Sequence, residues 1–123
     1  MANRKDLLDQ STIAQVVLPV TSRVMARPHF LQQVEGPNAP QVIELVRDSL
    51  TIGRSRDVDL RIPSEELSRT HVRLERCATG FQMVDLDSSN GVYLNEIKIY
   101  SAELRDGDTI QIGNVVFIYY EGR

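Results

Sequence analysis

Short apolar runs separated by turn-forming residues make up the chain from residue 28 onward. Several runs alternate apolar and polar positions, which is the period of a strand with one buried face. The breaks between them hold glycine, proline, asparagine, aspartate and serine, which favour turns. No sustained helical period occurs there, so the pattern predicts an all-β sandwich or barrel of about ten short strands. These strands are expected at His29–Val34, Gln41–Val46, Leu50–Ile52, Val58–Ile62, His71–Glu75, Phe81–Leu86, Val92–Leu94, Ile97–Tyr100, Thr109–Ile112 and Val115–Tyr120.

Residues 1–27 differ from this pattern and are expected to form an N-terminal tail, mostly irregular or partly helical. The folded domain would then occupy residues 28–121. A short amphipathic helix over residues 5–18, ended by Pro19, is one interpretation of the tail. It rests on apolar residues at loosely helical spacing, namely Leu7, Leu8, Ile13, Val16 and Val17. The alternative is a mobile segment that forms this helix only transiently.

Composition and charge narrow the class of protein. The chain has 123 residues, 41% of them hydrophobic and 25% charged, which suits one globular core. Its net charge of −3 provides no basic field for nucleic acid, and its apolar runs are too short to span a membrane. With one cysteine, two histidines and no nucleophile or P-loop motif, we expect no catalysis, no cofactor and no metal. The single cysteine also fits a cytoplasmic location.

Three polar clusters lie at the ends of apolar runs, where a sandwich gathers its loops. If these loops meet, they bring together two guanidinium groups, several hydroxyls and a carboxamide. A phosphate group prefers such charge-assisted donors together with neutral ones. The clusters therefore predict recognition of a phosphate, and they are Gly53-Arg54-Ser55, Ser68-Arg69-Thr70-His71 and Ser88-Ser89-Asn90-Gly91.

In their order and spacing these clusters resemble the signature of the forkhead-associated (FHA) domain, a phosphothreonine-binding module. The signature is Gly-Arg, then Ser-Arg-x-His, then Asn-Gly, and here it reads Gly53-Arg54, Ser68-Arg69-Thr70-His71 and Asn90-Gly91. The resemblance covers residues 28–121. It implies a β-sandwich of eleven strands whose loops at one end hold a phosphothreonine of a partner.

The resemblance also implies a role for each residue of the signature. Arg54 and Ser68 would contact the phosphate, and Arg69 would support the phosphopeptide from the same loop. Ser89 stands where the family often has threonine, and would contact the phosphate or shape the pocket for the threonine methyl group. Asn90 would bind the peptide backbone. Structural support for the site would come from Gly53, His71 and Gly91.

Each of these residues has a simpler interpretation that the sequence leaves open. Arg54 could be a solvated loop residue, Ser68 could close a turn, and Arg69 could pair with a nearby acid on the surface. Asn90-Gly91 is in itself a strong signal for a type I′ hairpin turn, which is compatible with a ligand contact. A lone histidine such as His71 is more often a core residue than a ligand, and we expect His71 to brace the loops from inside.

One departure from the family pattern and two tail residues carry further expectations. Glu96 stands where the family has a glycine in a hairpin turn, which predicts an altered turn geometry. Some bacterial relatives have an extension whose phosphorylated threonine folds back into the pocket. By this resemblance Thr12 and Thr21 are candidate phosphoacceptors, with Thr12 preferred because more chain separates it from the domain. The alternative is that neither threonine is modified.

The function implied is phosphothreonine-dependent protein–protein interaction in Ser/Thr-kinase signalling. The partner would be a phosphothreonine-containing protein or peptide, in trans or the chain's own tail, with a Ser/Thr kinase upstream and no nucleic acid or membrane. The module could also be the input domain of a larger signalling protein. The alternatives are a structural scaffold domain that binds no phosphate, and an enzyme by fusion to a catalytic domain.

Overall fold

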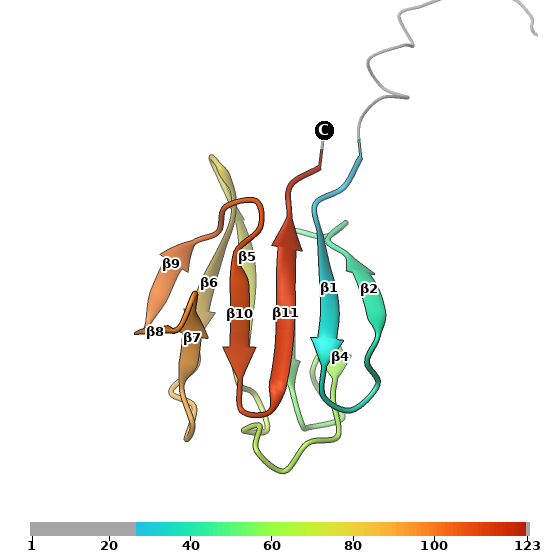
Figure 1. Ribbon diagram of the computed structural model, residues 1–123, viewed down its shortest axis with the longest axis vertical. Helices are drawn as coiled ribbons and strands as arrows, with labels where there is room; N and C mark the ends of the chain where they lie inside the picture. The colour runs from blue at the N-terminus through green and yellow to red at the C-terminus, as the bar shows by residue number, and fades with distance from the viewer. Residues whose placement is uncertain (1–26, 123) are drawn as a thin grey trace, which may run out of the picture.

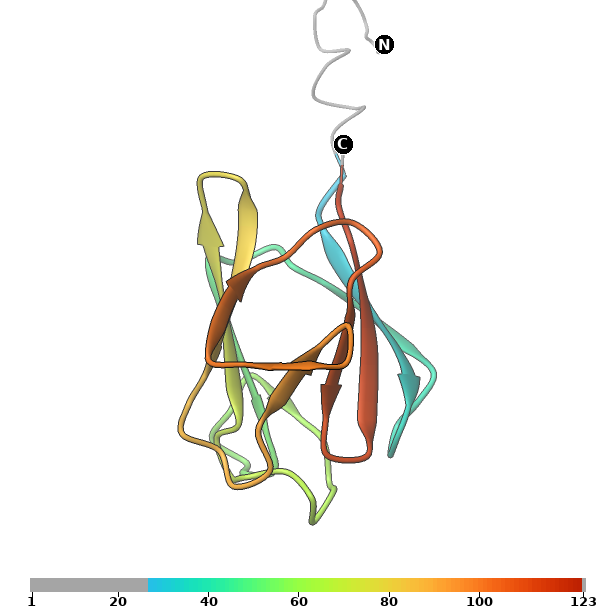
Figure 2. The same ribbon diagram turned by 60° about the vertical axis from the view of Figure 1, so that its left-hand side comes forward.

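The alternating runs fold into two sheets that face each other, as seen in a computed structural model that describes residues 27–122 (Figures 1 and 2). The expected all-β sandwich of eleven strands is confirmed. The first sheet has six strands, in the order β2 (Gln41–Glu44), β1 (Phe30–Glu35), β11 (Val115–Tyr120), β10 (Thr109–Ile112), β7 (Val92–Leu94) and β8 (Ile97–Ile99). The second has five, in the order β4 (Leu60–Arg61), β3 (Ser49–Gly53), β5 (Val72–Cys77), β6 (Gly80–Asp85) and β9 (Ser101–Glu103). All pairs of neighbouring strands with a recorded register are antiparallel except β3 and β4, which are parallel.

One strand, β9, has no counterpart among the ten predicted runs. Its three residues are Ser-Ala-Glu, which contain too little apolar character to mark a strand. It forms the edge of the five-stranded sheet and pairs only with β6, through the register Met83↔Ala102. The partner strand therefore determines β9, and the hydrophobic pattern does not.

The core lies between the sheets and follows the alternation of each strand. In β11, Val115, Phe117 and Tyr119 are buried while the residues between them are half-buried. Because side chains of a strand point alternately to its two faces, one set fills the core and the other faces outward. The buried apolar side chains are Leu31, Leu45, Ile52, Ile62, Leu67, Val72, Leu74, Phe81, Met83, Val92, Leu104, Ile110, Ile112, Val115, Phe117 and Tyr119.

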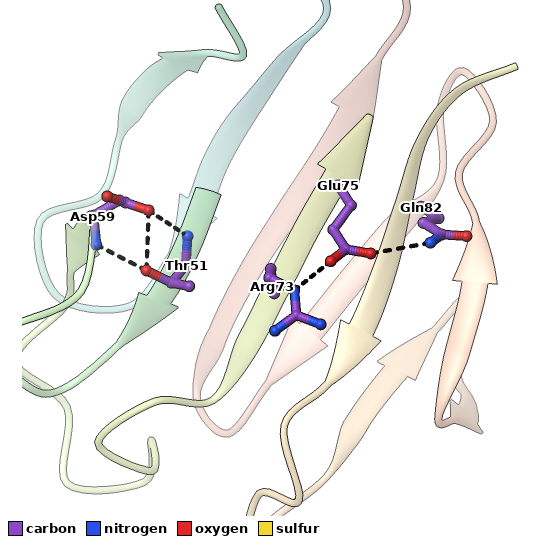
Figure 3. Close-up of polar contacts among 5 residues, drawn as sticks. All are labelled: Thr51, Asp59, Arg73, Glu75 and Gln82. Atoms are coloured by element: carbon purple, nitrogen blue, oxygen red, sulfur yellow. Dashed lines mark hydrogen bonds and ion pairs between the residues drawn. The ribbon is translucent and has the colours of Figure 1, made fainter. Parts of the chain in front are cut away.

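The outer face of the five-stranded sheet is polar and its side chains bond to one another (Figure 3). Glu75 accepts hydrogen bonds from Arg73 Nε at 2.6 Å and from Gln82 Nε2 at 3.1 Å. At the β3–β4 edge, Asp59 Oδ2 accepts from the backbone N–H of Thr51 at 2.9 Å and from its hydroxyl at 3.0 Å. The polar side chains of this face are therefore suited to exposure to solvent.

One turn prediction was wrong. Asn90-Gly91 is not a hairpin turn, because it joins β6 of one sheet to β7 of the other. The type I′ geometry occurs instead at Asn95-Glu96, between β7 and β8, where φ is 50° and 73°. Glu96 thus adopts a left-handed conformation, which glycine would adopt without strain. The predicted departure from the family's turn geometry stays a prediction.

The tail predictions lie outside the described residues. This applies to the helix expected at residues 5–18 and to Thr12 and Thr21. The described chain begins and ends at the same end of the sandwich, where residue 27 lies beside residue 122 (Figure 1). No helix within residues 27–122 is long and apolar enough to cross a membrane.

Candidate functional site

The three polar clusters meet at one end of the five-stranded sheet. Strands β3, β5 and β6 are antiparallel neighbours, with Ile52 opposite Val72 and Val72 opposite Asp85. The end of β3, the start of β5 and the end of β6 therefore lie side by side. In Figures 1 and 2 these segments form the lower end of the molecule, away from both described termini. The sheet order thus brings together loops that are distant in the sequence.

The first contact in this end joins the end of β3 to the loop before β5. Arg54 N donates to Ser68 O and Ser55 N to Arg69 O, each at 3.0 Å. The approach is so close that a Cβ on Gly53 would lie 2.1 Å from Arg69 O. Only glycine fits there, so close packing of the two loops explains why residue 53 is glycine.

A hydrogen bond to the loop before β5 holds the side chain of Arg54 in place without any ligand. Its Nε donates to Leu67 O at 3.0 Å, and this is the one hydrogen bond its side chain makes within residues 27–122. The two terminal nitrogens of the guanidinium therefore keep their donors for a ligand. An anion would meet a cation whose position is already fixed.

His71 is fully buried and joins two of the loops. Its Nδ1 accepts from Ser68 N at 3.0 Å, so Nδ1 carries no proton and Nε2–H donates to Gly91 O at 2.8 Å. Gly91 has φ of 82°, and its N–H donates to Ser88 Oγ at 3.0 Å. The imidazole thus ties the Ser68 loop to the β6–β7 loop from behind.

Two more contacts join these loops at the surface. Ser89 N donates to Ser68 Oγ at 2.9 Å, and Asn90 Nδ2 donates to Glu66 O at 2.7 Å. The Ser68 hydroxyl uses an oxygen lone pair in this contact, so its proton remains available to an acceptor. The Asn90 carboxamide likewise keeps its oxygen and one N–H for a ligand. Both side chains are therefore positioned and still able to bind.

A shallow open pocket of about 400 Å³ lies over this junction. It contains all five residues expected to contact a phosphorylated ligand, whereas Gly53, His71 and Gly91 lie behind it. Its two guanidinium groups and its hydroxyls suit an anion with several oxygen atoms. The residues that line the pocket are Arg54, Glu65, Glu66, Leu67, Ser68, Arg69, Thr70, Ser89 and Asn90.

A second set of supporting residues was not predicted from the sequence. Ser64 is only 4% exposed, and its hydroxyl bonds to Asn114 in the β10–β11 turn. In the same turn a Cβ on Gly113 would lie 2.7 Å from Glu66 Cβ, so this turn packs closely on the loop before β5. Ser64 and Asn114 are 50 residues apart, and no local pattern connects them. The six-stranded sheet thus supports a site built on the five-stranded one.

The described residues hold no group of three or more histidine, cysteine, aspartate or glutamate side chains arranged to bind a metal ion.

The part of the chain that forms the pocket is also the part that is similar to known proteins. The family model of the FHA domain matches residues 50–113. The oxoglutarate dehydrogenase inhibitor of Corynebacterium diphtheriae is 36% identical over 87 residues, which are 71% of this chain and 61% of that protein. The glycogen accumulation regulator GarA of Mycolicibacterium smegmatis is 34% identical over 87 residues, 71% of this chain and 55% of that protein. The chain thus spans well under two thirds of the length of these relatives.

A solved structure shows the same similarity in three dimensions. EmbR of Mycobacterium tuberculosis, in complex with a low-affinity phosphopeptide, aligns with a TM-score of 0.72 at 28% identity. The alignment covers 78% of this chain and 25% of that one. The sandwich described here therefore recurs as one part of a longer protein.

Proposed function

Because the chain belongs to the FHA-domain family, we propose that residues 28–121 bind phosphothreonine in the pocket that Arg54 and Ser68 line. FHA domains are phosphothreonine-dependent interaction modules of Ser/Thr-kinase signalling. The observation that carries the proposal is the convergence of all five expected contact residues on one pocket, with Arg54 held in place by Leu67 O. Prior ordering lowers the entropic cost of binding.

Each residue has a distinct task in this proposal. A phosphothreonine carries about −1.5 to −2 charges and three strong acceptor oxygens. The terminal nitrogens of Arg54 bind two of these oxygens, and the Ser68 hydroxyl donates to the phosphate. Arg69 adds charge from the same loop, while Ser89 contacts the phosphate or bounds the space for the threonine methyl. Asn90 binds the backbone of the peptide beside the phosphothreonine.

The binding is non-catalytic, because these contacts neither make nor break a covalent bond. A scaffold domain without phosphate binding is less favoured, since it would give Arg54 no reason to keep its donors free above a pocket. We place the protein in the cytoplasm, downstream of a Ser/Thr kinase. Its partner is a phosphothreonine segment of another protein or the chain's own residues 1–27, phosphorylated at Thr12 or Thr21.

Titration calorimetry with degenerate phosphothreonine peptides and their unphosphorylated counterparts tests the pocket. Arg54→Ala should weaken binding by a factor of about 30 or more, because removing one partner of a buried charge pair costs about 2–5 kcal/mol. The matched control is Arg105→Ala, which removes the same charge at the opposite end of the sandwich and should bind as the wild type does. Unchanged affinity in a folded Arg54→Ala protein would refute the assignment.

Peptides from the tail test whether the ligand is in cis. We expect a peptide centred on Thr12 or Thr21 to bind with micromolar affinity only when phosphorylated. Tethering would then raise its effective concentration to about millimolar, enough to occupy the pocket. If degenerate phosphopeptides bind and both tail phosphopeptides do not, the partner is another protein and the cis proposal fails alone.

A further inference from the structure

An apolar patch lies on the outer face of the six-stranded sheet along β2, β1 and β11, whereas Thr109 and Gln111 make the outer side of β10 polar. The outer face of the five-stranded sheet carries the polar side chains of Figure 3. Val42 is 60% exposed and Val34 is 39% exposed, and the rings of Phe30 and Tyr120 stack with centroids 5.0 Å apart. Strand register places Phe30 opposite Tyr120 and places Gln32 between Val42 and Ile118, while Val34 lies at a bulge of β1. The patch thus surrounds one polar side chain, that of Gln32. We define the outer apolar face as Phe30, Val34, Val42, Val116, Ile118 and Tyr120.

Strand β11 indicates that this face is covered. All six of its residues are apolar, Val-Val-Phe-Ile-Tyr-Tyr, and such a run is typical of a strand buried on both faces. An antiparallel strand with one wet face normally alternates apolar and polar residues instead. Within residues 27–122 only the inner face of β11 is covered by a second layer. The outer apolar face therefore lacks the covering element that its sequence anticipates.

The N-terminal segment has the composition and the attachment point to supply that element. Residues 1–26 precede Phe30, which itself belongs to the outer apolar face. Between Leu18 and Phe30 the chain can span up to roughly 36 Å, more than the roughly 20 Å length of a six-residue strand. The segment can therefore turn back along the sheet, and the aliphatic residues that it would bring are Leu7, Leu8, Ile13, Val16 and Val17.

Charge points to the same occupant. Residues 1–27 contain four basic and two acidic residues, a net charge of +2, which leaves −5 for residues 28–123. Glu35 and Glu44 lie on β1 and β2 at the rim of the outer apolar face and are exposed. A second copy of the folded domain would bring the same negative charge to this face, whereas the segment brings the opposite sign.

We propose that the apolar side chains of residues 5–18 pack on the outer apolar face of the same chain, without phosphorylation. The contact covers β1, β2 and β11 and leaves the loops of the phosphothreonine pocket open. It goes beyond the proposed function, because it needs no phosphate and uses a different surface. Each buried aliphatic side chain removes apolar surface from water, which is the driving force of the contact.

Paramagnetic relaxation enhancement in the unphosphorylated full chain tests this contact. Cys77→Ser removes the single native cysteine, and Ser11→Cys then places one spin label in the segment. The amide signals of Val34, Val42 and Ile118 should lose most of their intensity. Those of Arg73 and Glu75, on the opposite sheet, should keep theirs.

Variants on both sides of the contact provide the controls. Ile13→Ser with Val17→Ser should restore the lost intensity, whereas Gln15→Ser, a polar replacement in the same segment, should not. Val42→Thr keeps the shape of an exposed edge residue and should weaken the loss. Its fold is checked by unchanged signals on the five-stranded sheet.

Three results would overturn the proposal. Uniform intensities along the chain would show that the segment does not dock, and losses confined to Ser68 and Asn90 would place it in the pocket. Losses in a mixture of spin-labelled protein with separate isotope-labelled protein would assign the face to a second copy. Phosphopeptide titration of the same samples reports on the pocket and not on the outer apolar face, so this proposal and the proposed function can fail separately.

Discussion

At the residue scale, His71 shows how one buried side chain can join two loops of the proposed binding site. Its two nitrogens bond to backbone groups of two different loops, so the ring is neutral and carries its proton on Nε2. The position of Arg54 follows from a similar contact, with Leu67 O. In both cases the partner is a backbone atom, which any residue at that position would supply.

This use of backbone partners explains what the sequence could predict at this scale. The family pattern predicts Arg54, Ser68 and Asn90 as site candidates because their side-chain chemistry is itself the signal, and all three line one pocket. It could not identify Ser64 or Asn114, because serine and asparagine are common in any loop and their contact spans 50 residues. The chemical type of a candidate residue could be read from the sequence. The contact between two distant side chains could be found only from the three-dimensional structure.

The carboxylate of Asp59 makes the stability of the fold depend on pH. The backbone N–H and the hydroxyl of Thr51 hold the pKa of Asp59 below its ordinary value of 3.8, and the Arg47 charge adds to this in the same direction. A lowered pKa means that the folded state favours the charged form. The resulting stability is present above pH 3.8 and is lost as the pH falls below this value, through the lowered pKa of the folded state.

We therefore expect Asp59→Asn to reduce the acid sensitivity of the fold. Urea denaturation at pH 7 and at pH 3 should show a smaller loss of unfolding free energy in Asp59→Asn than in the wild type. The variant should be less stable than the wild type at pH 7, because a neutral amide accepts weaker hydrogen bonds than a carboxylate. Equal pH dependence in the two proteins would contradict this role of Asp59.

At the scale of elements, the β7–β8 hairpin contains a conformational cost. Both turn residues have positive φ, and only one of them has a visible compensation. Asn95 donates from Nδ2 to Asp108 and accepts from Thr109 N, each at 2.9 Å. Glu96 makes no hydrogen bond through its side chain within the described residues, although an L-residue in this conformation is strained by about 1–2 kcal/mol.

Replacing Glu96 with glycine should therefore stabilise the protein. We expect the free energy of unfolding to rise by about 0.5–1 kcal/mol, since glycine removes the strain but adds entropy to the unfolded chain. Chemical denaturation measures the change. The matched control is Asn95→Gly, which should lower stability because it removes two hydrogen bonds. A destabilised Glu96→Gly protein would show that the carboxylate has a structural partner.

The elements also show where the hydrophobic pattern succeeds. Ten strands could be predicted because each contributes at least one alternating apolar position to the core. Strand β9 could not be predicted, because it is held at the edge of the sheet by its pairing with β6. Its own side chains give no strand signal. Asn90-Gly91 was mistaken for a hairpin turn, since a hairpin turn is defined by the strands it joins, and β6 and β7 lie in different sheets.

At the scale of the whole molecule, a buried tyrosine lies at the end of the sandwich opposite the proposed pocket. Tyr119 lies in β11 at the end away from the pocket, and its hydroxyl bonds to His29 Nδ1 at 2.8 Å. Burial, followed by the negative charge of Glu121, raises the pKa of Tyr119 to about 12, from an ordinary value of 10.0. The folded state thus retains a proton that the unfolded state loses, and stability falls as the pH rises from 10 toward 12.

Tyr119→Phe should change the stability of the protein without changing its affinity for phosphopeptides. At pH 7 we expect its unfolding free energy to be lower by about 1 kcal/mol, because the hydrogen bond to His29 is lost. Its further loss of stability between pH 9 and pH 11 should be smaller than that of the wild type. Phosphopeptide affinity at pH 7, measured by calorimetry, should not change. A weaker affinity would mean that the two ends are coupled through β11.

The adjacency of residues 27 and 122 has a consequence for how the sandwich can be rewired. Since the two ends lie together and opposite the pocket, a short peptide could join them while new termini are opened elsewhere. The exposed tip at Ala78-Thr79, between β5 and β6, lies away from the pocket and suits such a cut. A circular permutant opened there would keep every contact around Arg54, and the domain could equally be inserted whole into a surface loop of a host protein.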